Sequence, residues 1–285
     1  MPTLYKETPE KQAKTNPLKA SILMGILNVT PDSFYDGGSY YHLSDAITRA
    51  AQLELDGASI IDVGGVSSRP NASAVPEEEE FNRVIPVIKE LSKKTTLPIS
   101  VDTHRASIAK EAIKAGATII NDVSGFKSIL MQKVAAEHQV DICLMHRQGT
   151  PLTMQINPSY RKGVVPSLMK WFDKKISELL NAGVKEEKII LDPGIGFGKT
   201  VEQNIEILKN ISCFKSFGLR LLVGISRKSF ISKITGKPSQ HLLPPTLALN
   251  TLLIQEGVDI LRVHDIYEHN LILQTLQAYA QPNKN

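Results

Sequence analysis

The chain has 285 residues, of which 42% are hydrophobic and 22% are charged, and its formal net charge is +4. This length is close to the roughly 250 residues of a single (β/α)8 barrel, and the composition is typical of a soluble globular protein. No apolar stretch approaches the roughly 18 residues of a membrane span, and the basic residues do not gather into a nucleic-acid-binding stripe. Membrane and nucleic-acid partners are therefore not expected.

The ends of the chain and its cysteines give a simple organisation. Residues 1–19 are polar and rich in lysine, without the apolar core of a secretion signal, so we expect a tail followed by one barrel domain over residues 20–282. Cys143 and Cys213 lie far apart and form no Cys-x-x-Cys pair, which gives no indication of a zinc site or a disulfide framework. A reducing, cytoplasmic location is expected.

Apolar runs alternate with segments of helical spacing along the rest of the chain. The runs predict eight strands, over residues 22–27, 58–63, 97–101, 117–120, 140–144, 188–191, 219–225 and 258–261. The segments between and after them predict helices over residues 42–55, 77–93, 106–114, 127–138, 165–182, 201–211, 246–256 and 267–278. This alternation predicts a single (β/α)8 TIM barrel with parallel strands, and a doubly wound open sheet is the alternative. The irregular residues 148–163 are expected at the functional face.

Polar side chains follow most of the predicted strands, and parallel strands of a barrel present their carboxyl ends at one rim. One set consists of carboxylates and amides, namely Asn28, Asp62, Asp102, Asn121 and Asp192. A second set is cationic or can become so, namely Arg69, Lys228, Arg262 and His264. The first set suits the amino-amide edge of a flat heterocycle and the second suits an anionic group. Met145 and Phe197 are candidates for contact with the ring.

Several of these residues also have a structural interpretation. Asp62 precedes two glycines and could equally hold its own loop through hydrogen bonds. Asn121 and Asp122 are adjacent and must point to opposite faces of a strand, and we expect Asn121 to face the barrel axis. Arg262 and His264 share strand parity, and an ion pair that closes the barrel is the alternative to ligand binding.

Two familiar types of site are not supported. The segment 194–200 resembles a phosphate-binding P-loop, but proline occupies position 193, where that motif requires glycine. The seven histidines show no metal-ligand spacing, so a protein-caged transition metal is not expected. A Mg2+ ion carried by a substrate's phosphates needs only one or two protein oxygens, which Asn28 or Asp36 could supply.

Eight segments at successive strand ends resemble those of dihydropteroate synthases. The two signature segments are MGILNVTPDSF at residues 24–34, and DVGG at 62–65 followed by SSRP at 67–70. The other six are VDT at 101–103, IND at 120–122, LMH at 144–146, LDPG at 191–194, SRKS at 226–229 and RVHD at 262–265. The resemblance covers essentially the whole chain after the tail.

The resemblance implies a cytoplasmic transferase of folate biosynthesis, usually homodimeric, that uses Mg2+ and is a target of sulfonamides. The family condenses 6-hydroxymethyl-7,8-dihydropterin diphosphate with 4-aminobenzoate, giving 7,8-dihydropteroate and pyrophosphate.

The matching motifs imply roles for individual residues of this chain. The resemblance implies catalytic roles for Asp102, Asp192 and Lys228. Substrate-binding roles, mainly to the pterin ring and the diphosphate, are implied for Ser68, Asp102, Asn121, Met145, Asp192, Phe197, Lys228, Arg262, Val263 and His264. The aminobenzoate side is implied for Phe34, Arg69, Pro70 and Ser229. Asn28 would bind the Mg2+ ion, with Asp36 as a possible second ligand. Asp102 and Asp192 would stabilise the cationic pterin that forms as its bond to the diphosphate stretches.

Position 66 departs from the family pattern. The family commonly has Glu-Ser-Thr-Arg-Pro-Gly after the paired glycines, whereas this chain has Val66, Ser68 and Asn71 in place of the acid, the threonine and the last glycine. Val66 removes a charge from a loop expected to close over substrate, and it favours one alternative, a noncatalytic pterin-binding paralogue. Another alternative is a methyltetrahydrofolate–corrinoid methyltransferase, which shares the ring-holding residues but needs no diphosphate site.

Overall fold

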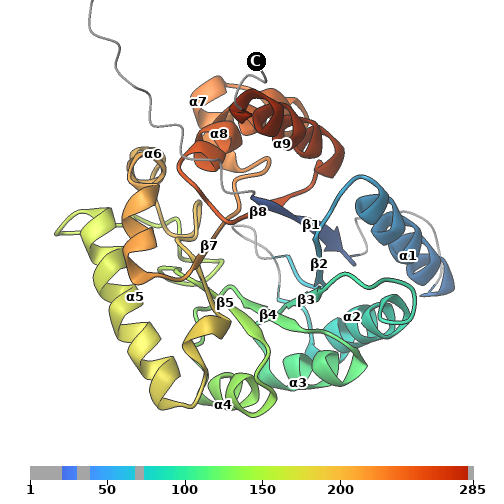
Figure 1. Cartoon of the computed structure of the whole chain (residues 1–285). Coiled ribbons are helices and arrows are strands. Elements are labelled where there is room, and N and C mark those ends of the chain that lie inside the picture. The colour runs from blue at the N-terminus through green and yellow to red at the C-terminus, as the bar shows by residue number, and fades with distance from the viewer. Residues whose placement is uncertain (1–20, 31–38, 68–73, 282–285) are drawn as a thin grey trace, which may run out of the picture.

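The computed structural model describes residues 21–30, 39–67 and 74–281. Within them, eight parallel strands pair in chain order and close into a barrel, with the helices in a ring outside (Figure 1). The strands are β1 (Ile22–Asn28), β2 (Ile60–Gly64), β3 (Ile99–Asp102), β4 (Ile119–Asp122), β5 (Asp141–Met145), β6 (Ile189–Asp192), β7 (Arg220–Val223) and β8 (Ile260–Val263). The predicted barrel is confirmed and the open sheet is excluded. The expected tail, residues 1–19, lies outside the described residues.

The helices follow the predicted alternation. They are α1 (Ser39–Leu55), α2 (Glu77–Leu91), α3 (Ala106–Ala115), α4 (Ile129–His138), α5 (Val164–Asn181), α6 (Val201–Lys209), α7 (Ser229–Thr235), α8 (Leu243–Gln255) and α9 (Ile266–Ala280). The sequence did not predict α7, because two turns are too short to show helical periodicity. Short 3-10 helices at Glu186–Lys188, Ile211–Phe217 and Ser239–His241 were also missed. Across the described residues, no helix has the length and apolarity needed to span a bilayer.

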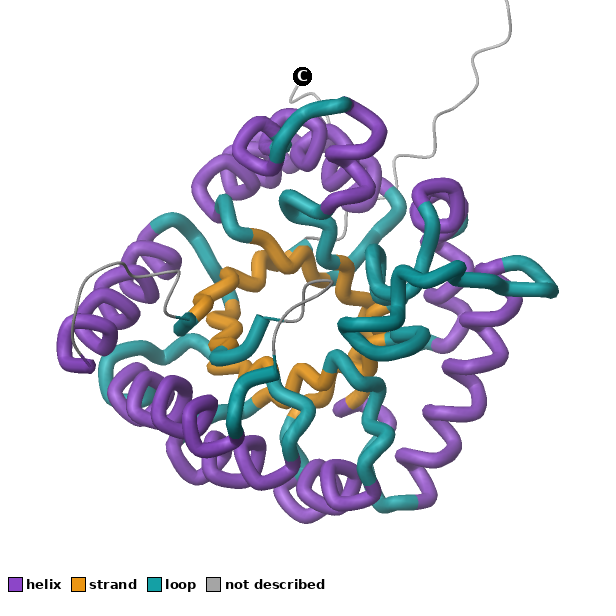
Figure 2. The backbone as a smooth tube through the Cα atoms, turned by 180° about the vertical axis from the view of Figure 1, so that it is seen from behind, coloured by secondary structure: helices purple, strands orange, loops and turns teal. Residues whose placement is uncertain are grey.

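The barrel interior is filled in layers. Successive side chains of a strand point to opposite faces, so every second residue faces the axis. An apolar layer consists of Met24, Ile60, Ile119, Cys143, Ile190, Leu222 and Ile260, all buried. The outward-facing residues pack against the helices in a second, larger core. Figure 2 shows the strands as a closed ring that separates these two regions. The polar side chains at the carboxyl ends of the strands therefore lie next to an apolar layer that fills the barrel interior.

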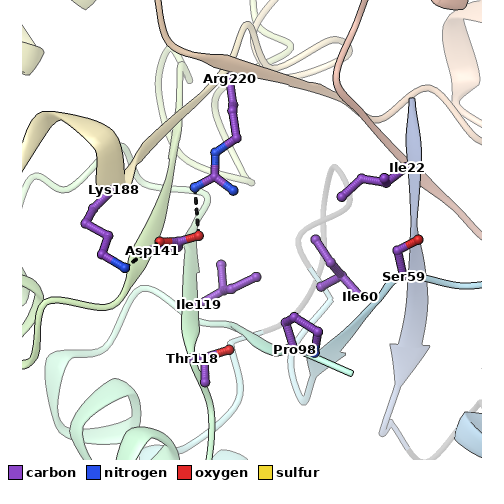
Figure 3. Close-up of a pocket in the computed structure, with 9 residues that line it drawn as sticks. All are labelled: Ile22, Ser59, Ile60, Pro98, Thr118, Ile119, Asp141, Lys188 and Arg220. Carbon is purple, nitrogen blue, oxygen red and sulfur yellow. Dashed lines mark hydrogen bonds and ion pairs between the residues drawn. The ribbon is translucent and has the colours of Figure 1, made fainter. Parts of the chain in front are cut away.

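The opposite mouth of the barrel contains ion pairs. Asp141, at the start of β5, lies 3.2 Å from Nζ of Lys188 and 2.7 Å from Nη2 of Arg220 (Figure 3). These residues line a pocket of about 250 Å³ together with apolar side chains such as Ile22 and Ile60. None of the predicted site residues is among those that line this pocket.

Candidate active site

Four strands contribute to one hydrogen-bonded network at the carboxyl end of the barrel. Arg262 on β8 donates from Nε to Oδ2 of Asp62 on β2 over 2.7 Å. Its Nη2 donates to Oδ2 of Asp102 on β3 over 2.8 Å. Asn121 on β4 donates from Nδ2 to the same oxygen of Asp62 over 3.2 Å. The predicted polar residues of these four strand ends are thus brought into direct contact.

Asp62 is the centre of this network. Its side chain is fully buried, and its Oδ2 accepts from both Arg262 and Asn121. The interpretation that Asp62 holds its own loop is therefore wrong. Its second oxygen, Oδ1, has no hydrogen-bond partner within the described parts of the chain. The ion-pair alternative for Arg262 is realised, with Asp62 and Asp102 as its partners.

Asn121 and Asp122, which are adjacent on β4, point to opposite faces of the strand, as predicted. Asn121 faces the axis, where it contacts Asp62. Asp122 accepts from the backbone N–H of Ser124 over 2.7 Å and from that of Phe126 over 2.9 Å. Its carboxylate therefore holds the turn after β4, and only Asn121 is available to a ligand in the barrel mouth.

Asp192, Phe197 and Lys228 form a second group beside the network. Asp192 is buried at the end of β6, where its Oδ1 accepts from the backbone N–H of Gly194 over 2.7 Å. Lys228 Nζ lies 4.5 Å from the centroid of the Phe197 ring, and it donates to the backbone oxygen of Ile195. This arrangement places an aromatic face, a cation and a carboxylate at neighbouring strand ends.

Burial shifts the ionisation of these groups. Desolvation raises the pKa of Asp102 to about 7, although the Arg262 guanidinium opposes the change. Desolvation also raises the pKa of Asp192 against the opposing effect of Lys228. Desolvation lowers the pKa of Lys228 to about 8, and the nearby carboxylate of Asp192 partly opposes this decrease. Burial disfavours the charged form of Arg262, but Asp62 and Asp102 outweigh it and raise the pKa of Arg262. Arg262 is therefore charged at neutral pH, where Asp102 can either donate or accept a hydrogen bond.

The residues after β7 and β8 have separate environments. His264 Nδ1 lies 3.0 Å from Oγ of Ser226, and its backbone N–H donates to the same oxygen over 3.3 Å. Ser229 is exposed at the start of α7.

Two other predicted contacts are buried at the ends of strands. Val263 is fully buried in the outer apolar core, so the predicted substrate contact of Val263 could come only from its backbone. Met145 is buried at the end of β5, paired in register with Asp192.

Five predicted site residues, Phe34, Asp36, Ser68, Arg69 and Pro70, lie outside the described residues. Asn28 is half-buried at the carboxyl end of β1, where it pairs in register with Gly64. No group of three or more His, Cys, Asp or Glu side chains in the described ranges is placed to hold a metal ion. A Mg2+ ion that keeps water and phosphate ligands needs few protein oxygens, and the Asn28 amide oxygen is a hard donor of the type it prefers. Asn28 therefore fits such an ion.

Sequence reasoning missed two buried charges beneath the site. Lys199, the lysine of the rejected P-loop match, is only 2% exposed and donates to backbone oxygens of its own loop. Glu80 on α2 is fully buried, where it accepts from Thr103 Oγ1 over 2.6 Å and pairs with Arg105. The only sequence signal for Lys199 is its place directly after a glycine-rich segment. Glu80 stands among four consecutive glutamates, and nothing in that pattern separates it from the exposed ones.

Comparison with known proteins gives a consistent result. The family described as pterin binding enzyme matches residues 24–264. The dihydropteroate synthase of Bacillus subtilis is 45% identical over 247 residues, which make up 86% of this chain and 84% of that protein.

Solved structures agree with the sequence match. The structure of a Yersinia pestis dihydropteroate synthase with a sulfonamide drug complex has a TM-score of 0.87 and 38% identity, covering 92% of this chain and 95% of that one. A Xanthomonas albilineans dihydropteroate synthase with 4-aminobenzoic acid has a TM-score of 0.86 and 36% identity, covering 93% of this chain and 95% of that one. The similarity therefore extends over nearly the full length of each protein.

Proposed function

Because the chain belongs to the pterin-binding enzyme family, we propose that the carboxyl end of its barrel carries out dihydropteroate synthesis with the side chains described above. The chain is a transferase that condenses 6-hydroxymethyl-7,8-dihydropterin diphosphate with 4-aminobenzoate. The products are 7,8-dihydropteroate and pyrophosphate. The observation that carries this proposal is the group of buried Asp102, Asn121 and Asp192 beside the stacked pair of Lys228 and Phe197.

The pterin ring binds between these two groups. Its amino-amide edge presents N–H donors and a carbonyl acceptor, which match the carboxylates of Asp102 and Asp192 and the amide of Asn121. Lys228 contacts the ring from the Phe197 side, where its Nζ already lies over an aromatic face. Met145 packs next to Asp192 and provides apolar contact. Since these polar groups are buried, a ring lacking the matching edge would leave them unpaired and bind weakly.

Arg262 can hold the diphosphate without leaving its carboxylate partners. A guanidinium has five N–H donors, and the contacts to Asp62 and Asp102 use Nε and Nη2. The two N–H groups of Nη1 therefore stay available for phosphate oxygens. His264 supplies a second donor from the loop after β8, with Ser226 orienting its ring. Ser68 adds a hydroxyl from the loop after β2.

The reaction forms one C–N bond and breaks one C–O bond. The neutral amino group of 4-aminobenzoate attacks the methylene carbon of the pterin, the bonding electrons leave with pyrophosphate, and the amine nitrogen releases a proton to solvent. Negative charge grows on the departing pyrophosphate, where Arg262 and His264 stabilise it. Positive charge develops on the pterin, where the carboxylates of Asp102 and Asp192 stabilise it. No strong base is needed, because the arylamine is already a nucleophile.

A Mg2+ ion held by Asn28, with Asp36 as a second candidate ligand, would neutralise charge on the departing pyrophosphate. Sulfonamides would compete with 4-aminobenzoate on the side formed by Phe34, Arg69, Pro70 and Ser229. This proposal follows from the Yersinia pestis relative, which was solved with a sulfonamide drug complex.

We also propose a homodimer in the cytoplasm. Four large side chains of α8 and α9, Leu252, Tyr267, Leu271 and Tyr279, are between 45% and 85% exposed, which supports association through these helices. Cys143 and Cys213 are both unpaired, as expected in a reducing compartment. Size-exclusion chromatography with light scattering tests the dimer directly, and a monomeric mass at micromolar concentration would contradict it.

The experiment that tests the synthase is identification of the product. The purified chain is incubated with both substrates and Mg2+, and 7,8-dihydropteroate is sought by mass spectrometry. Formation of this product is expected. A protein that binds the pterin but makes no product would favour the noncatalytic paralogue, and Val66→Glu would then be the first variant to examine. Transfer of a methyl group to a corrinoid would favour the methyltransferase.

A further inference from the structure

The loop that joins β6 to α6, residues 193–200 and here called the β6–α6 loop, is held by side chains that bond its backbone oxygens and three of its backbone N–H groups. Three glycines at alternate positions have φ angles of 67°, 83° and 69°. Every backbone oxygen from residue 194 to residue 200 accepts a side-chain hydrogen bond. The donors in chain order are Lys199, Lys228, Gln155, Lys199, Tyr160, Asn204 and Asn204. The loop is therefore fixed by side chains rather than by regular secondary structure.

Lys199 makes the innermost of these contacts. Its Nζ lies 2.8 Å from the backbone oxygen of Gly194 and 3.1 Å from that of Phe197. It also lies 3.1 Å from Nδ1 of His146 and 3.4 Å from the His146 backbone oxygen. A buried ammonium is costly unless its hydrogens are bonded, and here four acceptors surround three hydrogens. Lys199 thus joins both ends of the loop to the segment that follows β5.

The two segments pack too closely to be rearranged easily. A Cβ atom on Gly194 would lie 2.0 Å from the backbone oxygen of His146. One on Gly198 would lie 2.7 Å from the backbone oxygen of Gln148. On the far side, the His146 ring packs edge-on against Trp171, with ring centroids 4.9 Å apart. Lys199 consequently reaches both segments from an interior position, with contacts to His146 on one side and to Gly194 and Phe197 on the other.

The part of the loop that Lys199 holds carries two contacts of the proposed pterin site. Ile195, between the two bonded carbonyls, supplies the backbone oxygen that accepts from Lys228. Phe197 supplies the aromatic ring that lies beneath the ammonium of Lys228. We infer that Lys199 is a positioning residue for the pterin site, where it fixes the β6–α6 loop so that Phe197 and Lys228 meet the ring. This inference rests on the proposed function. Desolvation by the surrounding protein lowers the pKa of Lys199 to about 7, and the neutral amine present above that pH still donates two hydrogen bonds to the loop.

The test compares Lys199→Met, which keeps the unbranched apolar stem of the side chain and removes its donors, with Lys209→Met on the exposed face of α6. Steady-state kinetics should show the KM for the dihydropterin diphosphate rising about ten-fold in Lys199→Met, the loss expected for about one neutral hydrogen bond. The KM for 4-aminobenzoate should stay within about two-fold of wild type. Lys199→Gln has the same reach as Lys199→Met but retains two donors, and it should give an intermediate KM. Trp171 is the single tryptophan, so its emission reports whether the packing around His146 has changed.

A purely structural role gives a different pattern. It would lower kcat through loss of active protein while both KM values stay unchanged, and that result in a folded Lys199→Met or Lys199→Gln protein would overturn the inference. Binding of the dihydropterin diphosphate, measured by calorimetry, needs no turnover. Equal dissociation constants for wild type and Lys199→Met would therefore contradict the role of Lys199, whereas a wild-type protein that releases no pyrophosphate would contradict the synthase function.

Discussion

Arg262 on β8 donates from Nη2 to Oδ2 of Asp102 on β3, over 2.8 Å, across the carboxyl mouth of the barrel. The same guanidinium also bonds Asp62 through Nε. One cation thereby pairs with two buried carboxyl groups while keeping donors available for an anion. The pterin side and the diphosphate side of the proposed site are linked through this residue.

Replacement of Arg262 by methionine should lower the free energy of unfolding by about 3–5 kcal/mol, because it leaves two buried carboxylates without a counter-charge. The matched control is Arg220→Met at the opposite mouth, where the paired arginine side chain is 40% exposed. An exposed ion pair of this kind contributes about 0–1 kcal/mol to the free energy of unfolding. Urea unfolding at pH 7 measures both, and equal losses in the two variants would contradict the account of the network.

The pH dependence of stability should report Asp102. Burial raises its pKa in the folded protein to about 7, against about 3.9 in an unfolded chain. The folded state therefore holds an extra proton between these values, and the resulting stabilisation, complete below about pH 4, is lost as the pH rises through 7. Asp102→Asn removes this titration. The free energy of unfolding of wild type minus that of Asp102→Asn should fall between pH 4.5 and pH 8, and parallel curves would show that Asp102 titrates normally.

Asp192→Asn should weaken binding of the dihydropterin diphosphate and slow turnover. A hydrogen bond to a charged group contributes about 1.5–3 kcal/mol, so kcat/KM should drop about ten-fold to a hundred-fold. Asp173→Asn, on the exposed face of α5, is the matched control and should behave as wild type. Unchanged kinetics in Asp192→Asn would remove Asp192 from the site.

Asn28→Ala should raise the Mg2+ concentration needed for half-maximal activity by about ten-fold, since the ion loses a protein oxygen but keeps its phosphate and water ligands. Chelation of Mg2+ should abolish pyrophosphate release in wild type. Asn181→Ala, at the exposed end of α5, should leave the Mg2+ requirement as it is. A Mg2+ titration identical for Asn28→Ala and wild type would exclude Asn28 as a ligand.

The sequence predicted the barrel and its rim because each depends on local patterns. Alternation of apolar runs and helical spacing specified eight strand ends, and polar residues at those ends had to meet once the sheet closed. Parity along β4 placed Asn121 and Asp122 on opposite faces, but it did not by itself say which of them faces the axis.

Contacts between distant segments could not be read in this way. The pairing of Arg262 with Asp62 and Asp102 joins residues up to 200 positions apart, and it depends on the reach of one side chain across the mouth. Lys199 was missed because its partners are mainly backbone oxygens, which have no sequence signature. Val263 is an example of the opposite error. Its motif implied a contact with substrate, but its position on β8 directs the side chain into the outer apolar core.

Pyrophosphate release tests the central claim most directly. The purified protein is given dihydropterin diphosphate and Mg2+, with and without 4-aminobenzoate, and pyrophosphate and 7,8-dihydropteroate are both quantified. Dihydropteroate synthesis at this rim predicts release that depends on 4-aminobenzoate, with the two products formed in equal amounts. Tight pterin binding without 4-aminobenzoate-dependent release would contradict it.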